Sequence, residues 1–128
     1  MATTRETALA LAGNLKRLMD HHELSQAQLS KKAGVGQSTL SNLLDSSSPL
    51  EINPRADTIE RLADYFGIPS WQLLIPDLPL QLLMNQRLSK LIENYRDAPE
   101  NGRENINRVA ESEVRYAAVN AGLKKTGS

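Results

Sequence analysis

The feature that most constrains this chain is the stretch 26–45, QAQLSKKAGVGQSTLSNLLD, in which two short helical patterns are separated by a glycine. Ser25 followed by Gln28 forms a capping box, which predicts that a helix begins at Gln26. Gly34 predicts where that helix ends, because a left-handed cap favours a residue without a Cβ. A second helix is expected about three residues later. The stretch therefore predicts two short helices joined by a tight turn.

The second of these helices has two faces of different chemistry. An apolar set is expected to hold the two helices at a steep angle: Leu29, Ala33, Val35, Leu40 and Leu43. The amide and hydroxyl side chains of Gln37, Ser38, Ser41 and Asn42 are left on the other face. An ordinary solvated face is one explanation for them. Uncharged hydrogen-bonding groups are also the kind that reads base edges in DNA, and this is the interpretation we favour.

Charge limits how such a face can work. The chain of 128 residues has a formal net charge of zero, and residues 1–75 carry seven Lys and Arg against eight Asp and Glu. Bulk attraction to phosphates is therefore excluded as the main source of affinity. Binding to DNA would need a few well-placed cations, helix N-termini and more than one subunit per site.

Several other classes of protein are disfavoured by what the sequence lacks. Cysteine is absent, which excludes disulfides and thiol chemistry. No nucleophile with a base, no phosphate-binding glycine loop and no set of metal ligands is present, so we expect no enzyme, cofactor or metal. The neighbouring histidines His21 and His22 are better explained by a favourable place near the negative end of a helix dipole than by a metal site. Without an apolar leader or a membrane span, a cytoplasmic protein is expected.

The periodicity predicts an all-α fold in which residues 1–75 form one domain of five helices. The first helix is expected from Thr4 to His21, with a Thr3–Glu6 capping box and an inner stripe of Leu11, Leu15 and Leu18. The two short helices described above follow it. A fourth helix is expected from Arg55 to Phe66, ended by Gly67, and then a short fifth helix capped by Ser70, in which Trp71 and Leu74 close the core.

The prolines at 76 and 79 predict a linker over 76–80, followed by a helical oligomerisation region over 81–122 and a flexible tail over 123–128. Two helices are expected in that region, from about Leu80 to Arg96 and from about Arg103 to Asn120. They cannot bury both of their apolar stripes as an isolated hairpin. The residues expected to mediate self-association are Leu88, Leu91, Ile92, Tyr95, Ile106, Val109 and Val114, although packing within the hairpin explains Tyr95 equally well.

The chain resembles the lambda-repressor-like helix-turn-helix family, which includes phage repressors, Cro proteins and small bacterial regulators. The resemblance covers about Ala8 to Leu74 and rests on LKRLMDHHELSQAQLSKKAGVGQSTLSNLL and the later TIERLADYFGI. It implies a five-helix DNA-binding domain whose second short helix enters the major groove. A sequence-specific regulator of transcription is therefore expected.

The resemblance also implies roles for individual residues. Gln37, Ser38 and Asn42 match positions that contact bases, with Ser41 on the same face, and Gln26 matches a phosphate contact at a helix N-terminus. The further residues predicted to contact phosphate are Gly36, Arg17, Lys32, Ser46 and Arg55.

Three departures from the family pattern stand out. Gly36 lies where a capping Ser or Thr is usual, so the cap is weaker. Met19 and Leu44 replace an ion pair, and we predict that they touch. Glu23 replaces a common glycine.

These expectations combine into a repressor of a phage or mobile element that binds a palindromic operator as a homodimer, with a tetramer also possible. The competing interpretation is an antitoxin that neutralises a toxin protein through residues 80–121 and regulates its own promoter. A chain of this length has no room for the self-cleaving domain of some phage repressors. Release is therefore expected to come from another protein, an antirepressor.

Overall fold

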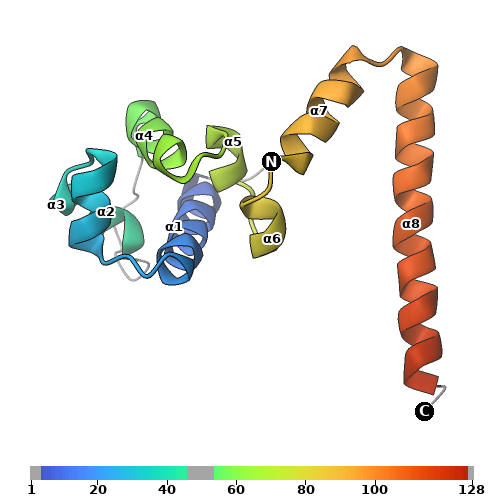
Figure 1. Cartoon of the computed structure of the whole chain (residues 1–128), viewed down its shortest axis with the longest axis horizontal. Helices are drawn as coiled ribbons and strands as arrows, with labels where there is room; N and C mark the ends of the chain where they lie inside the picture. Colours follow the sequence, from blue (N-terminus) through green and yellow to red (C-terminus); the bar gives the residue numbers. More distant parts are fainter. Residues whose placement is uncertain (1–3, 46–53, 127–128) are drawn as a thin grey trace. The chain divides into compact units, whose positions relative to one another are not determined.

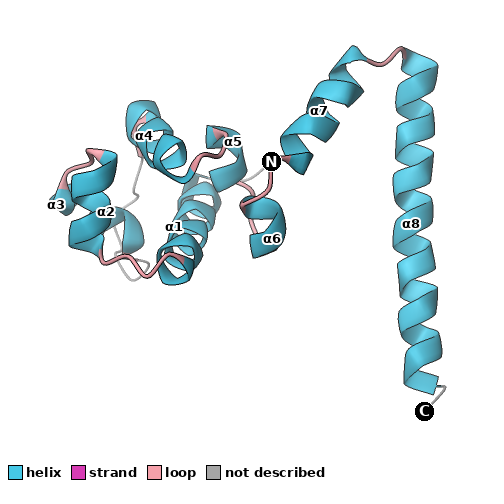
Figure 2. Cartoon of the chain, viewed as in Figure 1, coloured by secondary structure: helices cyan, strands magenta, loops and turns pink. Residues whose placement is uncertain are grey.

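The computed structural model describes residues 4–45 and 54–126, and the side chains of residues 6–45 and 54–122. Within these residues the chain forms eight α-helices and no strand (Figures 1 and 2). The expected all-α class is thus confirmed. The chain divides into two compact units, and the division falls between Arg87 and Leu88 in the sequence.

Helix α1 (Thr4–His21) supplies the centre of the first unit's core. Its inner stripe is Leu11, Leu15 and Leu18, all at most 1% exposed, as the periodicity predicted. The expected capping partner Thr3 lies outside the described residues. Helix α1 packs against α3, α5 and α6.

Two departures from the family pattern have a structural explanation at the ends of α1 and α3 (Gln37–Leu44). Met19 lies on α1 and Leu44 on α3, and these two helices pack together. Both side chains are buried, at 7% and 6% exposure. Two apolar side chains at these positions therefore add to the core where an ion pair is usual. Glu23 has a φ of 54°, a left-handed conformation that favours glycine. This explains why glycine is common at its position.

Helix α4 (Ala56–Phe66) ends where expected, at Gly67 with a φ of 70°. The following helix α5 (Ser70–Leu73) differs from the prediction in its cap and in its buried side chains. Ser70 is the first helical residue and Pro69 occupies the cap position without a side-chain bond. Trp71 is 36% exposed, whereas Gln72 and Leu73 are fully buried. The prediction that Ser70 caps the helix and that Trp71 closes the core was wrong.

The buried side chain of Gln72 explains this shift, because its amide has partners inside the fold. Its Nε2 donates to the carbonyl oxygens of Leu82, Leu83 and Asn85, at 2.9, 3.1 and 3.4 Å. A buried polar side chain is stable only with such partners. These partners come from the next helix, α6 (Leu80–Leu83), and from the turn that follows it.

The segment 76–80 consequently belongs to the first unit, with Leu78 buried, although Pro76, Asp77 and Pro79 are exposed. Leu78 is 8% exposed and Leu83 is fully buried. The first unit therefore continues through α6 and ends at Arg87, later than the predicted boundary. The single helix expected from Leu80 to Arg96 is also wrong, because the chain leaves α6 at Met84 and starts α7 (Arg87–Asp97) three residues later.

The second unit consists of α7 and α8 (Glu100–Thr126), separated by Ala98 and Pro99. Arg103 joins them: its Nε donates to the carbonyl of Tyr95 at 2.9 Å, and its Nη2 to that of Arg96 at 2.7 Å. The Tyr95 hydroxyl accepts from Asn107 Nδ2 at 3.1 Å. Tyr95 therefore has a packing role within the unit.

Helix α8 is longer than predicted at both ends. It begins at Glu100 instead of Arg103 and continues to Thr126, so residues 123–126 are helical where a flexible tail was expected. The side chains from residue 107 to residue 122 are all exposed. None of the described helices is long and apolar enough to cross a membrane.

Candidate nucleic-acid interface

The two short helices of the first unit are joined by the turn that the sequence predicted. In α2 (Gln26–Ala33), the Gln28 backbone N–H donates to Ser25 Oγ at 3.2 Å and the Ser25 N–H donates to Gln28 Oε1 at 2.9 Å. Both halves of the capping box are therefore present. Gly34 ends α2 with a φ of 72°, and the chain re-enters a helix at Gln37.

Helix α3 separates its side chains as the pattern predicted. Leu40, Leu43 and Leu44 are buried against the neighbouring helices. The four residues predicted to contact bases are all exposed: Gln37, Ser38, Ser41 and Asn42. They form two pairs spaced four residues apart, which places them as neighbours on one helix face. This face carries two amides and two hydroxyls and no charge.

The N-terminus of α3 lacks a side-chain cap. Gly36 occupies the cap position with φ −56° and ψ 138°, and no side chain caps the helix there. The backbone N–H groups of a helix's first turn point outward, where they can bind an anion. The predicted phosphate contact at Gly36 is therefore available only through the backbone.

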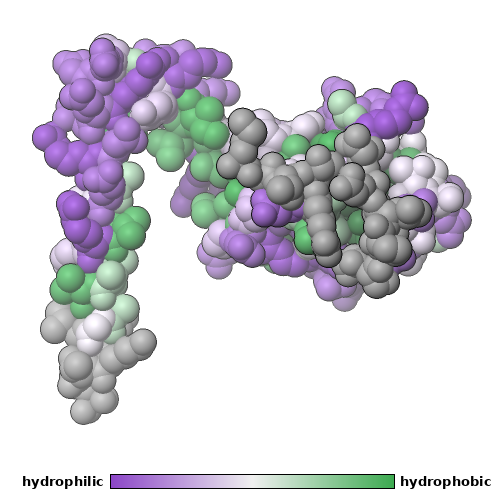
Figure 3. Space-filling model, turned by 180° about the vertical axis from the view of Figure 1, so that it is seen from behind, coloured by the Kyte–Doolittle hydropathy of each residue, from purple (hydrophilic) through white to green (hydrophobic). Residues whose placement is uncertain are grey.

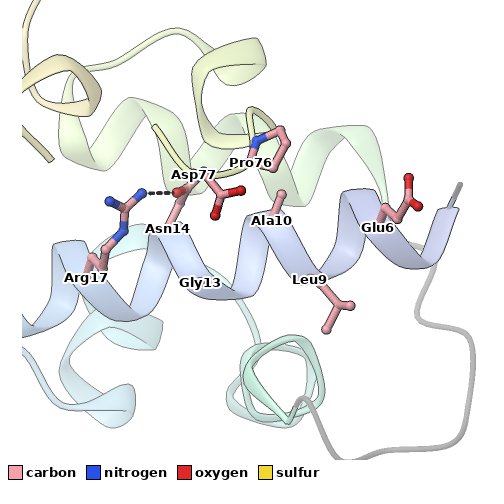
Figure 4. A pocket seen from close by; sticks show the side chains of 8 residues that line it. All are labelled: Glu6, Leu9, Ala10, Gly13, Asn14, Arg17, Pro76 and Asp77. Carbon is pink, nitrogen blue, oxygen red and sulfur yellow. Dashed lines mark hydrogen bonds between the residues drawn. The ribbon is translucent and has the colours of Figure 1, made fainter. Parts of the chain in front are cut away.

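Arg17 has a partner inside the fold. Its guanidinium Nη2 donates to Asn14 Oδ1, and Asn14 Nδ2 donates to the carbonyls of Leu73 at 2.7 Å and Ile75 at 3.0 Å. Figure 4 shows Arg17 and Asn14 beside Pro76 and Asp77, around a shallow pocket along α1. Asn14 thus holds α1 to the end of α5, and Arg17 bonds to Asn14 within α1. The phosphate contact of Arg17 stays a prediction.

The remaining predicted phosphate contacts are exposed wherever the structure describes them. Gln26 lies in the first turn of α2 and Lys32 in its last turn. Arg55 precedes α4 and forms an exposed ion pair with Asp57, Nε to Oδ1 3.4 Å. Such a pair holds a side chain only weakly, so Arg55 can exchange Asp57 for another anion. Ser46 lies outside the described residues.

The structure adds a residue that the sequence analysis missed. Arg61 on α4 donates from Nη1 to the carbonyl oxygen of Gly34 at 2.8 Å, across 27 positions of sequence. Ser30 Oγ donates to the next carbonyl, that of Val35. Nothing in a single sequence signals the first contact, because it depends on how α4 packs on α2.

The two histidines are explained by ring contacts. His21 and His22 meet edge to face at 5.1 Å between centroids, and His22 lies 5.6 Å from Phe66. In the second unit, Arg96 lowers the pKa of Asp97, and Asp97 raises the pKa of Arg96, in each case first through their hydrogen bond and then through charge attraction. This pair is largely exposed at the end of α7, in the second unit, and is not part of the helix-turn-helix.

Comparison with known families agrees with this geometry. Residues 15–70 match the model of a helix-turn-helix family, and the match includes α2, the turn, α3 and α4. Neither curated proteins nor solved structures give a match. The matched family is one of DNA-binding regulators of transcription. The first unit of this chain therefore contains a helix-turn-helix domain of the lambda-repressor-like family.

Proposed function

We propose that this protein is a sequence-specific regulator that recognises double-stranded DNA with the exposed face of α3. One observation carries the proposal: the buried leucines of α3 leave Gln37, Ser38, Ser41 and Asn42 together on its outer face. Amides of this kind pair bidentately with adenine, and a serine hydroxyl bonds to any base. Occupying promoter DNA in this way would make the protein a repressor, of the kind that phages and mobile elements use.

Selection from a pool of random duplexes tests the proposal directly. The full chain should enrich one motif with approximate two-fold symmetry at moderate salt. A pool without a preferred motif would contradict sequence-specific binding.

Substitution of Asn42 then tests the base-reading face. Asn42→Ala should weaken binding to the enriched duplex by about 1–3 kcal/mol and relax the choice of base at one position. Asn101→Ala is the matched control, because Asn101 is an exposed asparagine of the second unit. An equal loss on random DNA would show that Asn42 does not read bases.

We propose further that the second unit makes the protein a homodimer. Helix α7 has no buried residue. On α8 the exposed large apolar residues are Val109, Val114, Tyr116 and Val119, and Figure 3 shows green patches on the part of α8 nearer its C-terminal end. The most exposed of the predicted contacts are Leu91, Ile92, Val109 and Val114, at 46–71%. Helices with exposed stripes gain most of their stability from a partner. A second copy supplies one and brings two weakly charged recognition helices to one site.

The oligomeric state of the purified chain tests this assignment. Light scattering should show a dimer, or a tetramer that bridges two sites, and Val114→Glu should reduce it to a monomer. Asn101→Glu adds the same charge to an exposed position of α8 that has no predicted contact three or four residues away, and it should leave the dimer intact. A wild-type monomer, or equal effects of both changes, would contradict this role of the stripe.

The same exposed unit favours a second candidate function. An antitoxin would use α7 and α8 to cover a toxin protein and would still bind its own promoter through α3. A monomeric chain that co-purifies with one partner in a fixed ratio favours the antitoxin. A dimer that binds the operator with no partner favours the repressor, whose release would then fall to an antirepressor protein.

A further inference from the structure

Side chains of the neighbouring helices α2 and α4 bond to the turn between α2 and α3. Its two consecutive carbonyl groups, those of Gly34 and Val35, accept bonds from side chains of Arg61 and Ser30. The Ser30 bond is local, since Ser30 belongs to α2. The Arg61 bond comes from α4 and fixes the turn to another helix of the unit.

This external bond matters because α3 does little to fix its own start. Gly36 provides no side-chain oxygen to its first turn. A Ser, Thr, Asp or Asn cap would accept a hydrogen bond from a backbone N–H of the first turn. The start of α3 is therefore held by its buried leucines, which pack on α1 and α2, and by the turn, which the Arg61 bond ties to α4.

We propose that Arg61 is a positioning residue for the recognition helix: it sets the orientation of α3 through the Gly34 carbonyl, without reading bases. The inference rests on the proposed function of α3. Its physical basis is that a guanidinium presents donors in a rigid planar fork, which constrains direction as well as distance. A bond of this kind fixes α3 before DNA arrives, so less conformational freedom is lost on binding.

The guanidinium of Arg61 is also exposed, so a direct phosphate contact is the alternative that the experiment has to separate. The two roles leave different signatures. A positioning residue changes the selectivity between duplexes, whereas a phosphate contact strengthens binding to all duplexes and contributes about one unit to the salt dependence of log K.

The first arm uses the free full-length protein and amide hydrogen exchange measured by NMR. Arg61→Ala should speed exchange at the Val35 and Leu40 amides by about fivefold, the value of one net hydrogen bond, while amides of Leu15 and Leu18 in α1 keep their rates. Arg87→Ala is the matched control, because it removes an equal charge from an exposed position at the end of the first unit. Equal acceleration at all of these amides would show a general loss of stability and overturn the inference.

The second arm measures binding to the enriched duplex and to a random duplex from low to moderate salt. Arg61→Ala should weaken binding to the enriched duplex at least fivefold more than binding to the random one, with an unchanged salt slope. A slope lower by about 0.9 with equal losses on both duplexes would assign Arg61 to a phosphate and overturn the inference. If the wild type enriches no duplex, the proposed function fails, and the exchange arm still decides whether Arg61 holds the turn.

Discussion

Shortening the chain after Pro79 should destabilise the helix-turn-helix domain, whereas shortening it after Arg87 should not. The difference lies in α6 and the turn behind it. Residues 1–79 lose Leu83, which is fully buried, and the three carbonyl groups that accept from Gln72 Nε2. Residues 1–87 keep all of these contacts and end at the boundary of the unit.

The size of the effect follows from these two losses. Burial of a whole leucine side chain contributes about 1.5–3 kcal/mol. Loss of the hydrogen bond from the Gln72 amide costs about 0.5–1.5 kcal/mol net, because water reaches the amide once α6 is removed. The shorter fragment should therefore be less stable by about 2–4.5 kcal/mol, which is a large part of the 5–15 kcal/mol typical of a domain.

Urea unfolding followed by circular dichroism measures this difference in the free energy of unfolding. Within the 1–87 fragment, Leu83→Ala should cost about 2–5 kcal/mol. Leu82→Ala is the matched control with a half-exposed side chain, 40% exposed, and should cost less than about 1 kcal/mol. If the two fragments unfold with free energies within about 1 kcal/mol of each other, α6 is not part of the domain and this argument fails.

Three further changes test separate parts of the structure. Glu23→Gly should raise the free energy of unfolding by about 0.5–1 kcal/mol, because glycine relieves a left-handed φ of 54°; Asp20→Gly, within α1, should lower it, and a loss in both variants would contradict the explanation. Asn14→Leu should lower it by about 1–3 kcal/mol in urea, because the carbonyls of Leu73 and Ile75 lose their donor; an unchanged midpoint would show that these bonds add no stability. Lys32→Ala should lower the salt slope of DNA binding by about 0.9 if Lys32 contacts a phosphate, and an unchanged slope would remove Lys32 from the interface.

The helices of the recognition motif could be predicted from the sequence because their signals are local. The Ser25–Gln28 capping box and the glycines at 34 and 67 act within one turn of the residues that carry them. The leucine spacing then indicated which face of each helix is buried. Local rules of this kind do not depend on how the helices finally pack.

The errors occur where tertiary contacts override the local pattern. A buried glutamine beside an exposed tryptophan is the reverse of what hydropathy predicts, and only the carbonyls of α6 explain it. The prolines at 76 and 79 do interrupt the helices, but an interruption does not tell whether the segment packs on the domain. The Arg61–Gly34 bond and the bond from Asn14 to the Leu73 carbonyl likewise depend on which helices become neighbours.

The anchoring of α6 to the first unit also has a consequence for the spacing of the two DNA half-sites that the proposed dimer can bind. Only residues 84–86 separate the pinned end of α6 from the first residue of α7. If two copies associate through α7 and α8, as proposed, a connection of three residues limits how far each recognition helix can lie from the dimerisation region. Such a dimer should therefore tolerate few changes in the distance between the two half-sites of its operator. Inserting a few glycines at this joint would be expected to widen the range of operator spacings that the protein accepts.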